Sequence, residues 1–164
     1  MDVDPYYRYT RAEISLDNLR HNLREFRRAV PNHMKIMAVL KADAYGHGAI
    51  PVAREASASG VDYFAVAFLD EALELRQAGI EQPILVFGYT APEDVALAIQ
   101  HNLTLTVYTT KVLEQVQTVV AAQTSGRDQP AKIHIKLDTG MGRIGIVDED
   151  EAVHFVERAA SIPG

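Results

Sequence analysis

The first part of the chain carries two different hydrophobic patterns. Apolar side chains recur every three or four residues at Leu16, Leu19, Leu23, Phe26 and Val30. This spacing predicts an amphipathic helix over residues 16–30. A nearly continuous apolar run follows at residues 34–40, interrupted only by Lys35. Such a run predicts a strand buried on both faces, as parallel sheets require.

The rest of the chain repeats this alternation of strands and helices. Short apolar or alternating runs predict further strands at residues 63–67, 84–87, 104–107 and 131–137. Helical patterns follow the strands at about residues 50–59, 69–78, 90–101, 110–123 and 149–160. Asp148 is the predicted N-cap of the last helix, and Gly46, Gly48 and residues 125–130 predict loops. Five strand–helix units of this kind indicate crossover connections and a parallel sheet.

Two α/β architectures fit five such units. One is a doubly wound open sheet, and the other is a (β/α)₈ barrel, which typically needs about 250 residues. The amino-acid composition does not distinguish the open sheet from the barrel. The last four residues, SIPG at 161–164, are typical of the approach to another strand, so we expect the sheet to continue.

Composition and charge exclude several functional classes. The 164 residues include 16 basic and 22 acidic side chains, with a net charge of −6 and no basic stripe, which argues against a nucleic-acid partner. The longest apolar runs are far below the ~20 residues needed to cross a bilayer, and the polar start of the chain lacks a signal sequence. Cysteine is absent and the six histidines show no metal-ligand spacing. We therefore expect a cytoplasmic protein with no metal and no membrane partner.

Candidate chemistry appears first in the sequence KADAYGHG at residues 41–48. Lys41 follows a predicted buried strand, and both candidate architectures bind ligands at the C-terminal ends of parallel strands. Desolvation there favours the uncharged amine, which can form a Schiff base with a carbonyl or with pyridoxal phosphate. The alternative is a lysine that lays its stem over the sheet edge and leaves its amine in water. Tyr45 and His47 are equally open to a packing role.

The second candidate loop has the sequence KLDTGMGRIG, at residues 136–145. Its glycines match the spacing of a dinucleotide-binding fingerprint, but they follow the fifth strand and precede the helix start by several residues, so this match is weak. The planar guanidinium of Arg143 suits a carboxylate or phenolate oxygen. The alternative is a surface arginine paired with an acid at 148–150. Lys136 alternates with apolar neighbours, so on a barrel interior it must be paired or modified.

Together, the two loops resemble one known family. The sequence AVLKADAYGHG at residues 38–48 resembles the pyridoxal-phosphate lysine motif of alanine racemase, and residues 136–145 resemble its second hallmark. Residues 65–72 (AVAFLDEA) and 83–88 (PILVFG) also resemble the family, so the resemblance covers essentially the whole chain. Asp43 stands where many members have asparagine. The resemblance implies a TIM-type α/β barrel with about five of its eight units, residues 1–164 being the N-terminal portion of the barrel domain without the C-terminal β domain.

The resemblance also implies a function and a set of site residues. It implies pyridoxal-phosphate-dependent racemisation of L- and D-alanine, which supplies D-alanine as a peptidoglycan precursor. Lys41 would be the Schiff-base lysine and the base on one face of the substrate. Tyr45 would reach the cofactor phosphate, and Arg143 would lie beside the phenolic oxygen and the substrate carboxylate. Lys136 matches a position that is carbamylated in part of the family.

Several expectations follow for the chain as a whole. In the family, the base for the opposite face comes from the C-terminal domain of a partner subunit, so we expect a homodimer in the full-length protein. Racemisation needs proton delivery on both faces, so residues 1–164 alone are expected to be inactive. Open sheet edges should make them associate or pack loosely. The alternative function is a non-catalytic pyridoxal-phosphate-binding homeostasis barrel.

Overall fold

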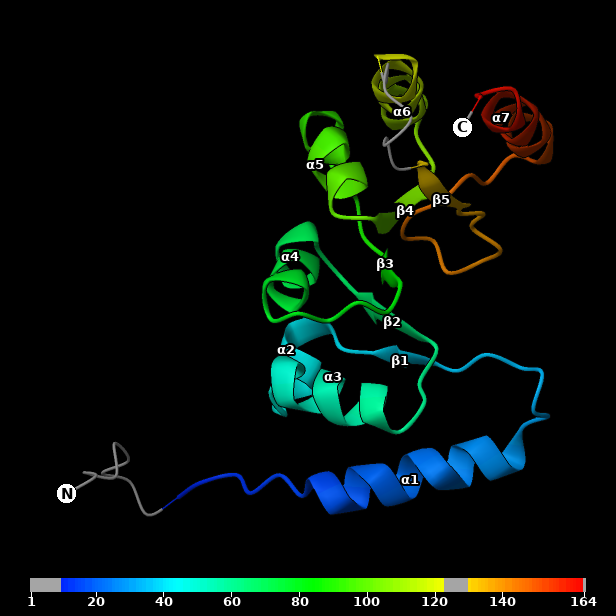
Figure 1. Cartoon of the computed structure of the whole chain (residues 1–164). Helices are drawn as coiled ribbons and strands as arrows, with labels where there is room; N and C mark the ends of the chain where they lie inside the picture. Colours follow the sequence, from blue (N-terminus) through cyan, green and yellow to red (C-terminus); the bar gives the residue numbers. More distant parts are fainter. Residues whose placement is uncertain (1–9, 123–129, 164) are drawn as a thin grey trace.

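The computed structural model describes residues 10–122 and 130–163 of the chain, and these form a single sheet with helices around it (Figure 1). The strands are β1 (Met37–Val39), β2 (Tyr63–Val66), β3 (Ile84–Val86), β4 (Leu103–Val107) and β5 (Lys132–Ile135). The helices are α1 (Leu16–Ala29), α2 (Lys41–Gly46), α3 (Ala49–Ala58), α4 (Leu69–Gln77), the 3₁₀ turn η1 (Pro92–Asp94), α5 (Val95–Gln100), α6 (Thr110–Ala122) and α7 (Glu149–Ala160). The five expected strand–helix units are therefore present.

The order of the strands decides between the two candidate architectures. All neighbouring strands are parallel, and their order in the sheet is β1-β2-β3-β4-β5, the same as their order in the chain. Right-handed crossovers between successive neighbours place the connecting helices on the same face. Helices α2 to α6 do lie on one side of the sheet (Figure 1). A doubly wound sheet instead reverses its strand order and has helices on both faces. The expectation of a partial TIM-type barrel is confirmed.

The hydrophobic core lies between the sheet and these helices. Alternate strand residues point into it, and the largest fully buried side chains include Phe64, Ile84, Leu103, Leu105, Leu75 and Leu113. The intervening strand residues point to the opposite side, which we call the open face. Thr104 and Thr106 of β4 and Lys132 and His134 of β5 belong to this second set, because they alternate with the core residues. The same alternation carries Lys136, two residues after His134, to the open face.

Strand β1 differs from its expected form. We expected a strand over residues 34–40 that is buried on both faces, whereas β1 has three residues and Met37 is exposed. Its position at the edge of the sheet explains the difference, since among the described residues β1 pairs with β2 alone. Residues before it are held by side chains instead: Arg27 donates to the carbonyl oxygen of Met34 (2.7 Å), and the backbone N–H of Ile36 donates to Asp62 (2.7 Å).

The remaining elements follow the expected pattern with local changes. Asp148 is the N-cap of α7, and its side chain accepts a hydrogen bond from the N–H of Glu151 (2.8 Å). The expected helix over residues 90–101 is divided into η1 and α5. Strand β5 is shorter than the expected 131–137, although Leu137 forms an isolated bridge to Ile146. Of the expected loop at 125–130, residues 125–129 lie outside the described residues.

No helix in the described ranges combines the length and the apolar character that a membrane span requires.

Candidate functional site

Lys41 begins a short left-handed turn at the C-terminal end of β1. Where we expected a loop, the next four residues, Ala42 to Tyr45, have φ between 52° and 58°. A left-handed conformation costs non-glycine residues roughly 1–2 kcal/mol each. Such strain persists only where surrounding contacts hold the backbone, and it concentrates at functional sites. The segment that carries Lys41 is therefore held by its surroundings in a conformation that the local sequence does not favour.

Asp43 connects this turn to the following helix. Its carboxylate accepts a hydrogen bond from the N–H of Ala49 at the start of α3 (2.6 Å), and its carbonyl oxygen accepts one from Gly48 (3.0 Å). An asparagine side chain would offer the same acceptor oxygen to Ala49. Aspartate and asparagine at position 43 are thus both compatible with this turn. His47 bonds locally, with Nδ1 2.8 Å from the carbonyl oxygen of Ala44.

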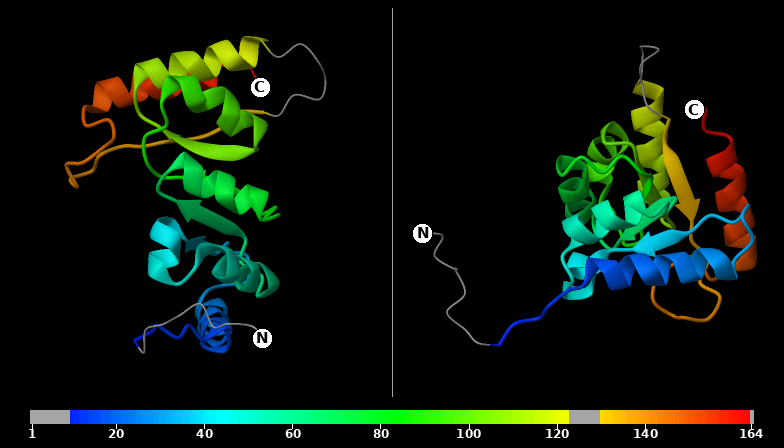
Figure 2. Two further views of the ribbon diagram at one scale, coloured as in Figure 1. Left: turned by 90° about the vertical axis from the view of Figure 1, so that its left-hand side faces the viewer. Right: turned by 60° about the horizontal axis from the view of Figure 1, so that its bottom comes forward.

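The second loop follows β5 and projects beyond the sheet, coloured orange in Figure 2. Its backbone folds around the carboxylate of Asp138, which accepts hydrogen bonds from the N–H groups of Gly140 (3.0 Å), Gly142 (3.0 Å) and Arg143 (3.1 Å). These backbone donors, that of Gly142 foremost, hold the pKa of Asp138 below its ordinary value. At Gly145, a Cβ would lie 2.8 Å from the backbone nitrogen of Asp138, so only glycine permits the return of the loop.

One cavity of about 580 Å³ joins the two loops at the C-terminal ends of the strands. Its lining consists of Lys41, Ala67, Phe68, Phe87, Gly88, Tyr89, Thr106, Tyr108, Lys136, Arg143 and Ile144. This volume is within the range of small-molecule sites, roughly 300–1,000 Å³. The lining contains three cationic side chains and no carboxylate. A cavity of this composition favours an anionic ligand with an apolar or aromatic body.

Of the four residues to which the resemblance assigns a role, Lys41, Lys136 and Arg143 meet in this cavity. Lys41 and Lys136 are half-buried, and Arg143 is exposed. Arg143 forms no ion pair with another described residue, and this includes the acids at 148–150. Tyr45 does not line the cavity. Its ring is exposed, and its centroid lies 5.8 Å from Nζ of Lys41. The fold thus brings together side chains that are about 100 positions apart in the chain.

Sequence reasoning missed the aromatic wall of the cavity. Phe68, Tyr89 and Tyr108 each lie just beyond the end of a strand, β2, β3 and β4 respectively. The ring centroids of Tyr89 and Tyr108 are 6.4 Å apart, and burial raises the pKa of Tyr108. Applying the strand-end rule used for Lys41 to every strand would have found all three.

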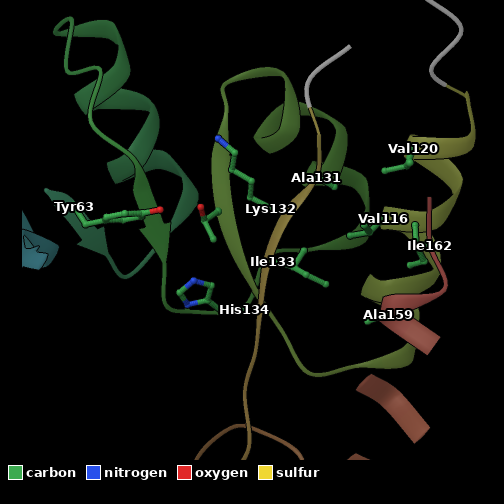
Figure 3. Close-up of a pocket in the computed structure, with 10 residues that line it drawn as sticks. Tyr63, Val116, Val120, Ala131, Lys132, Ile133, His134, Ala159 and Ile162 are labelled. Carbon is green, nitrogen blue, oxygen red and sulfur yellow. The ribbon is translucent and has the colours of Figure 1, made fainter. Parts of the chain in front are cut away.

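A second cavity, of about 390 Å³, lies around β5 near the opposite ends of the strands (Figure 3). Ile133 points toward Val116 and Val120 of α6, whereas Lys132 and His134 lie on the side of Tyr63. Because β5 has a strand partner on one side only within the described residues, this cavity follows from the unpaired sheet edge.

The described residues also hold no group of three or more metal-ligating side chains.

Comparison with known proteins identifies relatives that match about nine tenths of this chain. Residues 14–164 match the family described as alanine racemase, N-terminal domain. Alanine racemase 2 of Oceanobacillus iheyensis is 49% identical over 151 residues, which are 92% of this chain and 38% of that protein. An alanine racemase structure from Clostridium difficile 630 matches 90% of this chain and 38% of its own, with a TM-score of 0.82 and 38% identity. A histidine racemase structure from Leuconostoc mesenteroides matches 90% of this chain and 38% of its own, with a TM-score of 0.79 and 33% identity. The chain therefore spans about two fifths of the length of these relatives.

Proposed function

This chain belongs to the alanine racemase N-terminal domain family, and from that premise we propose that it is the lysine-bearing part of a pyridoxal-phosphate-dependent racemase. The observation that carries the proposal is the single cavity shared by Lys41, Lys136 and Arg143. The proposed substrate is alanine, interconverted between its L and D forms by the full-length protein. The proposed domain is the N-terminal portion of the barrel, residues 1–164.

The residues of the cavity fit pyridoxal phosphate. This cofactor has an aldehyde, a flat aromatic ring, a phenolic oxygen and a phosphate. The cavity supplies a lysine amine for the aldehyde, aromatic walls beside the ring and an excess of positive charge for the anionic groups. When bound, pyridoxal phosphate serves as an electron sink for the electron pair left at the substrate Cα.

Lys41 has two proposed roles. Its amine would hold the cofactor aldehyde and, once displaced by the amine of the substrate, would remove and return a proton at Cα on one face. Both roles require an amine that faces a cavity from the end of a strand, which is where Lys41 lies. Tyr45, next to Lys41 but outside the cavity lining, would reach the cofactor phosphate with its hydroxyl.

Arg143 would bind the substrate carboxylate and the phenolic oxygen of the cofactor. Asp138 supports this role because its carboxylate binds the N–H of Arg143 itself and thereby orders the loop. A non-catalytic homeostasis protein, the alternative function, has no substrate carboxylate and would not need a guanidinium here. The presence of Arg143 in the cavity therefore favours the racemase.

For Lys136 we propose carbamylation. Carbon dioxide would add to its neutral amine with release of one proton, and the resulting anion could orient Arg143 in the same cavity. With ¹³C-labelled bicarbonate, NMR should show one carbamate resonance that disappears in Lys136→Arg and persists in Lys132→Arg. An unmodified Lys136 in a well-ordered protein would contradict this proposal.

Racemisation also needs a group on the opposite face of the substrate. We propose that this base lies outside residues 1–164 and comes from a partner subunit of a homodimer, so that the isolated chain is inactive. We also propose that the full-length enzyme acts in the cytoplasm, where it would supply D-alanine for peptidoglycan.

Trapping of the cofactor tests the proposed function. The chain is incubated with pyridoxal phosphate, reduced with borohydride and digested, and the labelled lysine is located by mass spectrometry. Label is expected on Lys41, with loss in Lys41→Ala and retention in Lys111→Ala, a surface lysine of α6. In the full-length protein, Lys41→Ala should lower racemase activity by at least about 10²–10⁴-fold. Equal labelling of all surface lysines would overturn the proposal.

A further inference from the structure

Glu71 joins the segment that carries Lys41 to the end of the neighbouring strand. Glu71 lies in the first turn of α4, and its Oε1 accepts a hydrogen bond from the N–H of Ala42, 29 positions earlier (2.6 Å). Its Oε2 accepts from the N–H groups of Ala67 (2.7 Å) and Phe68 (3.0 Å). One carboxylate therefore binds three backbone donors from two separate loops.

From this contact we infer that Glu71 is a positioning residue that holds the Lys41 amine in the cavity. The inference rests on the proposed function, because it assigns a purpose to the placement of Lys41. Glu71 itself does not line the cavity, whereas Lys41, Ala67 and Phe68 do. Glu71 thus acts through its neighbours: it fixes the distance between two walls of the site without facing the ligand.

The strained turn explains why such a contact is needed. Ala42 is the first of four consecutive non-glycine residues with positive φ, and the turn would relax toward ordinary backbone without external bonds. Asp43 fixes the far side of the turn to α3, and Glu71 fixes the near side, next to Lys41. A shift of the Ala42 amide would move the adjoining Cα of Lys41 and redirect its side chain.

Capping of α4 does not account for the whole arrangement. A glutamate at the third position of a helix normally binds the N–H of the N-cap residue, here Phe68, and the positive end of the helix dipole favours its charge. That role uses one carboxylate oxygen. The second oxygen is directed to Ala42, which belongs to a different loop. Glu71 therefore has a second contact beyond the needs of its own helix.

Two variants and one matched control test the inference in this chain. Glu71→Gln keeps the shape but replaces one acceptor oxygen with an amide donor. Glu71→Asp keeps the charge and can still cap α4, but its side chain is one methylene too short to reach Ala42 as well. It therefore removes the contact to Ala42 alone, and it replaces Glu71→Gln in the test if that variant folds poorly. Glu74→Gln, on the same helix, changes an exposed side chain that makes no hydrogen bond to the described residues, and serves as the control.

Three readouts separate positioning from a general loss of structure. Amide exchange at Ala42 should accelerate at least about tenfold in both Glu71 variants, as expected for loss of one charge-assisted hydrogen bond. Borohydride trapping of pyridoxal phosphate on Lys41 should fall about tenfold relative to Lys111. Reductive methylation of Lys41 by formaldehyde, which needs no cofactor site, should rise relative to Lys111. Opposite changes in trapping and methylation identify a misdirected amine, because unfolding would make Lys41 and Lys111 equally reactive.

The outcomes distinguish this inference from the proposed function. If wild-type Lys41 is not labelled by pyridoxal phosphate, the proposed function fails, whereas amide exchange and methylation still report whether Glu71 places the amine. If both Glu71 variants expose Ala42 but leave the trapping and methylation of Lys41 at control levels, the positioning role is overturned and the proposed function stands. Unchanged exchange at Ala42 would overturn the contact itself.

Discussion

Gly88 lies just beyond the end of β3, beside the backbone that follows β2. Its N–H donates to the carbonyl oxygen of Ala67 (2.9 Å), and a Cβ built on Gly88 would overlap that same oxygen. The φ of Gly88 is not in the left-handed region, so the need for glycine is purely steric. Both residues line the cavity with Lys41, and any displacement here changes the shape of the site.

Gly88→Ala should therefore lower the free energy of unfolding by about 1–3 kcal/mol, the usual cost of overpacking. It should also reduce trapping of pyridoxal phosphate on Lys41. Gly79→Ala is the comparison, because Gly79 has a φ of 82° and open space around it. This variant should lower the free energy of unfolding by about 1–2 kcal/mol through its backbone conformation, and it should leave trapping on Lys41 unchanged. Urea denaturation measures both free energies. If Gly88→Ala has the same free energy of unfolding as the wild type, the steric argument is wrong.

Because Asp138 accepts the backbone hydrogen bonds that order the Arg143 loop, we expect the order of this loop to depend on pH. Backbone hydrogen bonds from Gly142 and Gly140 lower its pKa in the folded protein. A lowered folded pKa means that its stabilising contribution is complete above the unfolded value, about 3.9, and is lost as the pH falls through the folded value. The amide resonances of Gly142 and Arg143 should titrate with a midpoint below about 3.9 and should not titrate in Asp138→Asn. A midpoint at or above that value would contradict the assignment.

At the scale of the secondary-structure elements, helix α4 is hydrogen-bonded to other segments by a side chain at each of its ends. Glu71 in its first turn binds the loops around the cavity, and Arg76 in its last turn binds the opposite end of the sheet. The guanidinium of Arg76 donates to the carbonyl oxygens of Ile80 (2.7 Å), Gln82 (2.8 Å), His101 (3.0 Å) and Asn102 (3.1 Å). Burial lowers its pKa, although a guanidinium stays protonated. These carbonyls belong to the segments that lead into β3 and β4.

Arg76→Lys should destabilise the protein by about 1.5–3 kcal/mol, because an ammonium group cannot reach four carbonyls that surround a planar guanidinium. Arg54→Lys offers a comparison, since Arg54 makes one long, exposed contact to Ala78 (3.4 Å), and its change should stay within about 0.5 kcal/mol. Thermal unfolding of the two variants measures the difference. Equal melting temperatures would show that the Arg76 contacts contribute little.

At the scale of the whole molecule, the sheet has two open edges. Within the described residues, β1 pairs only with β2 and β5 only with β4. Unpaired parallel strands present free N–H and C=O groups that can pair with another chain. Met37 in β1 is exposed at one of these edges, and the second cavity surrounds β5 at the other.

The isolated chain of 164 residues should therefore self-associate. Sedimentation should show an average mass that rises with concentration, and Met37→Lys should reduce the association, since a charge on an edge strand opposes pairing. The comparison is Met141→Lys, in the exposed loop after β5. A sharply melting monomer over the whole concentration range would contradict this expectation.

The candidate site was only partly predictable from the sequence. Lys41 was predicted because it directly follows an apolar run, Lys136 because it alternates with apolar neighbours, and Arg143 because it lies in a glycine-rich loop. Tyr89 and Tyr108 were missed because the strand-end rule was applied to Lys41 and not to the ends of β3 and β4. Glu71 was also missed as a site-supporting residue, because its capping position in α4 explains its presence without Ala42.

By itself, the sequence determined the type and order of the elements and placed the candidate lysines at strand ends. Hydrophobic period, glycine breaks and caps such as Asp148 act between residues that are close in the chain, so they can be read locally. Only the tertiary structure decided that the strands have the same order in the sheet as in the chain, that Lys41 begins a left-handed turn, and that Arg143 lines the same cavity as Lys41. These features depend on backbone pairing and side-chain contacts between distant segments, whose free energy has no local signature in the chain.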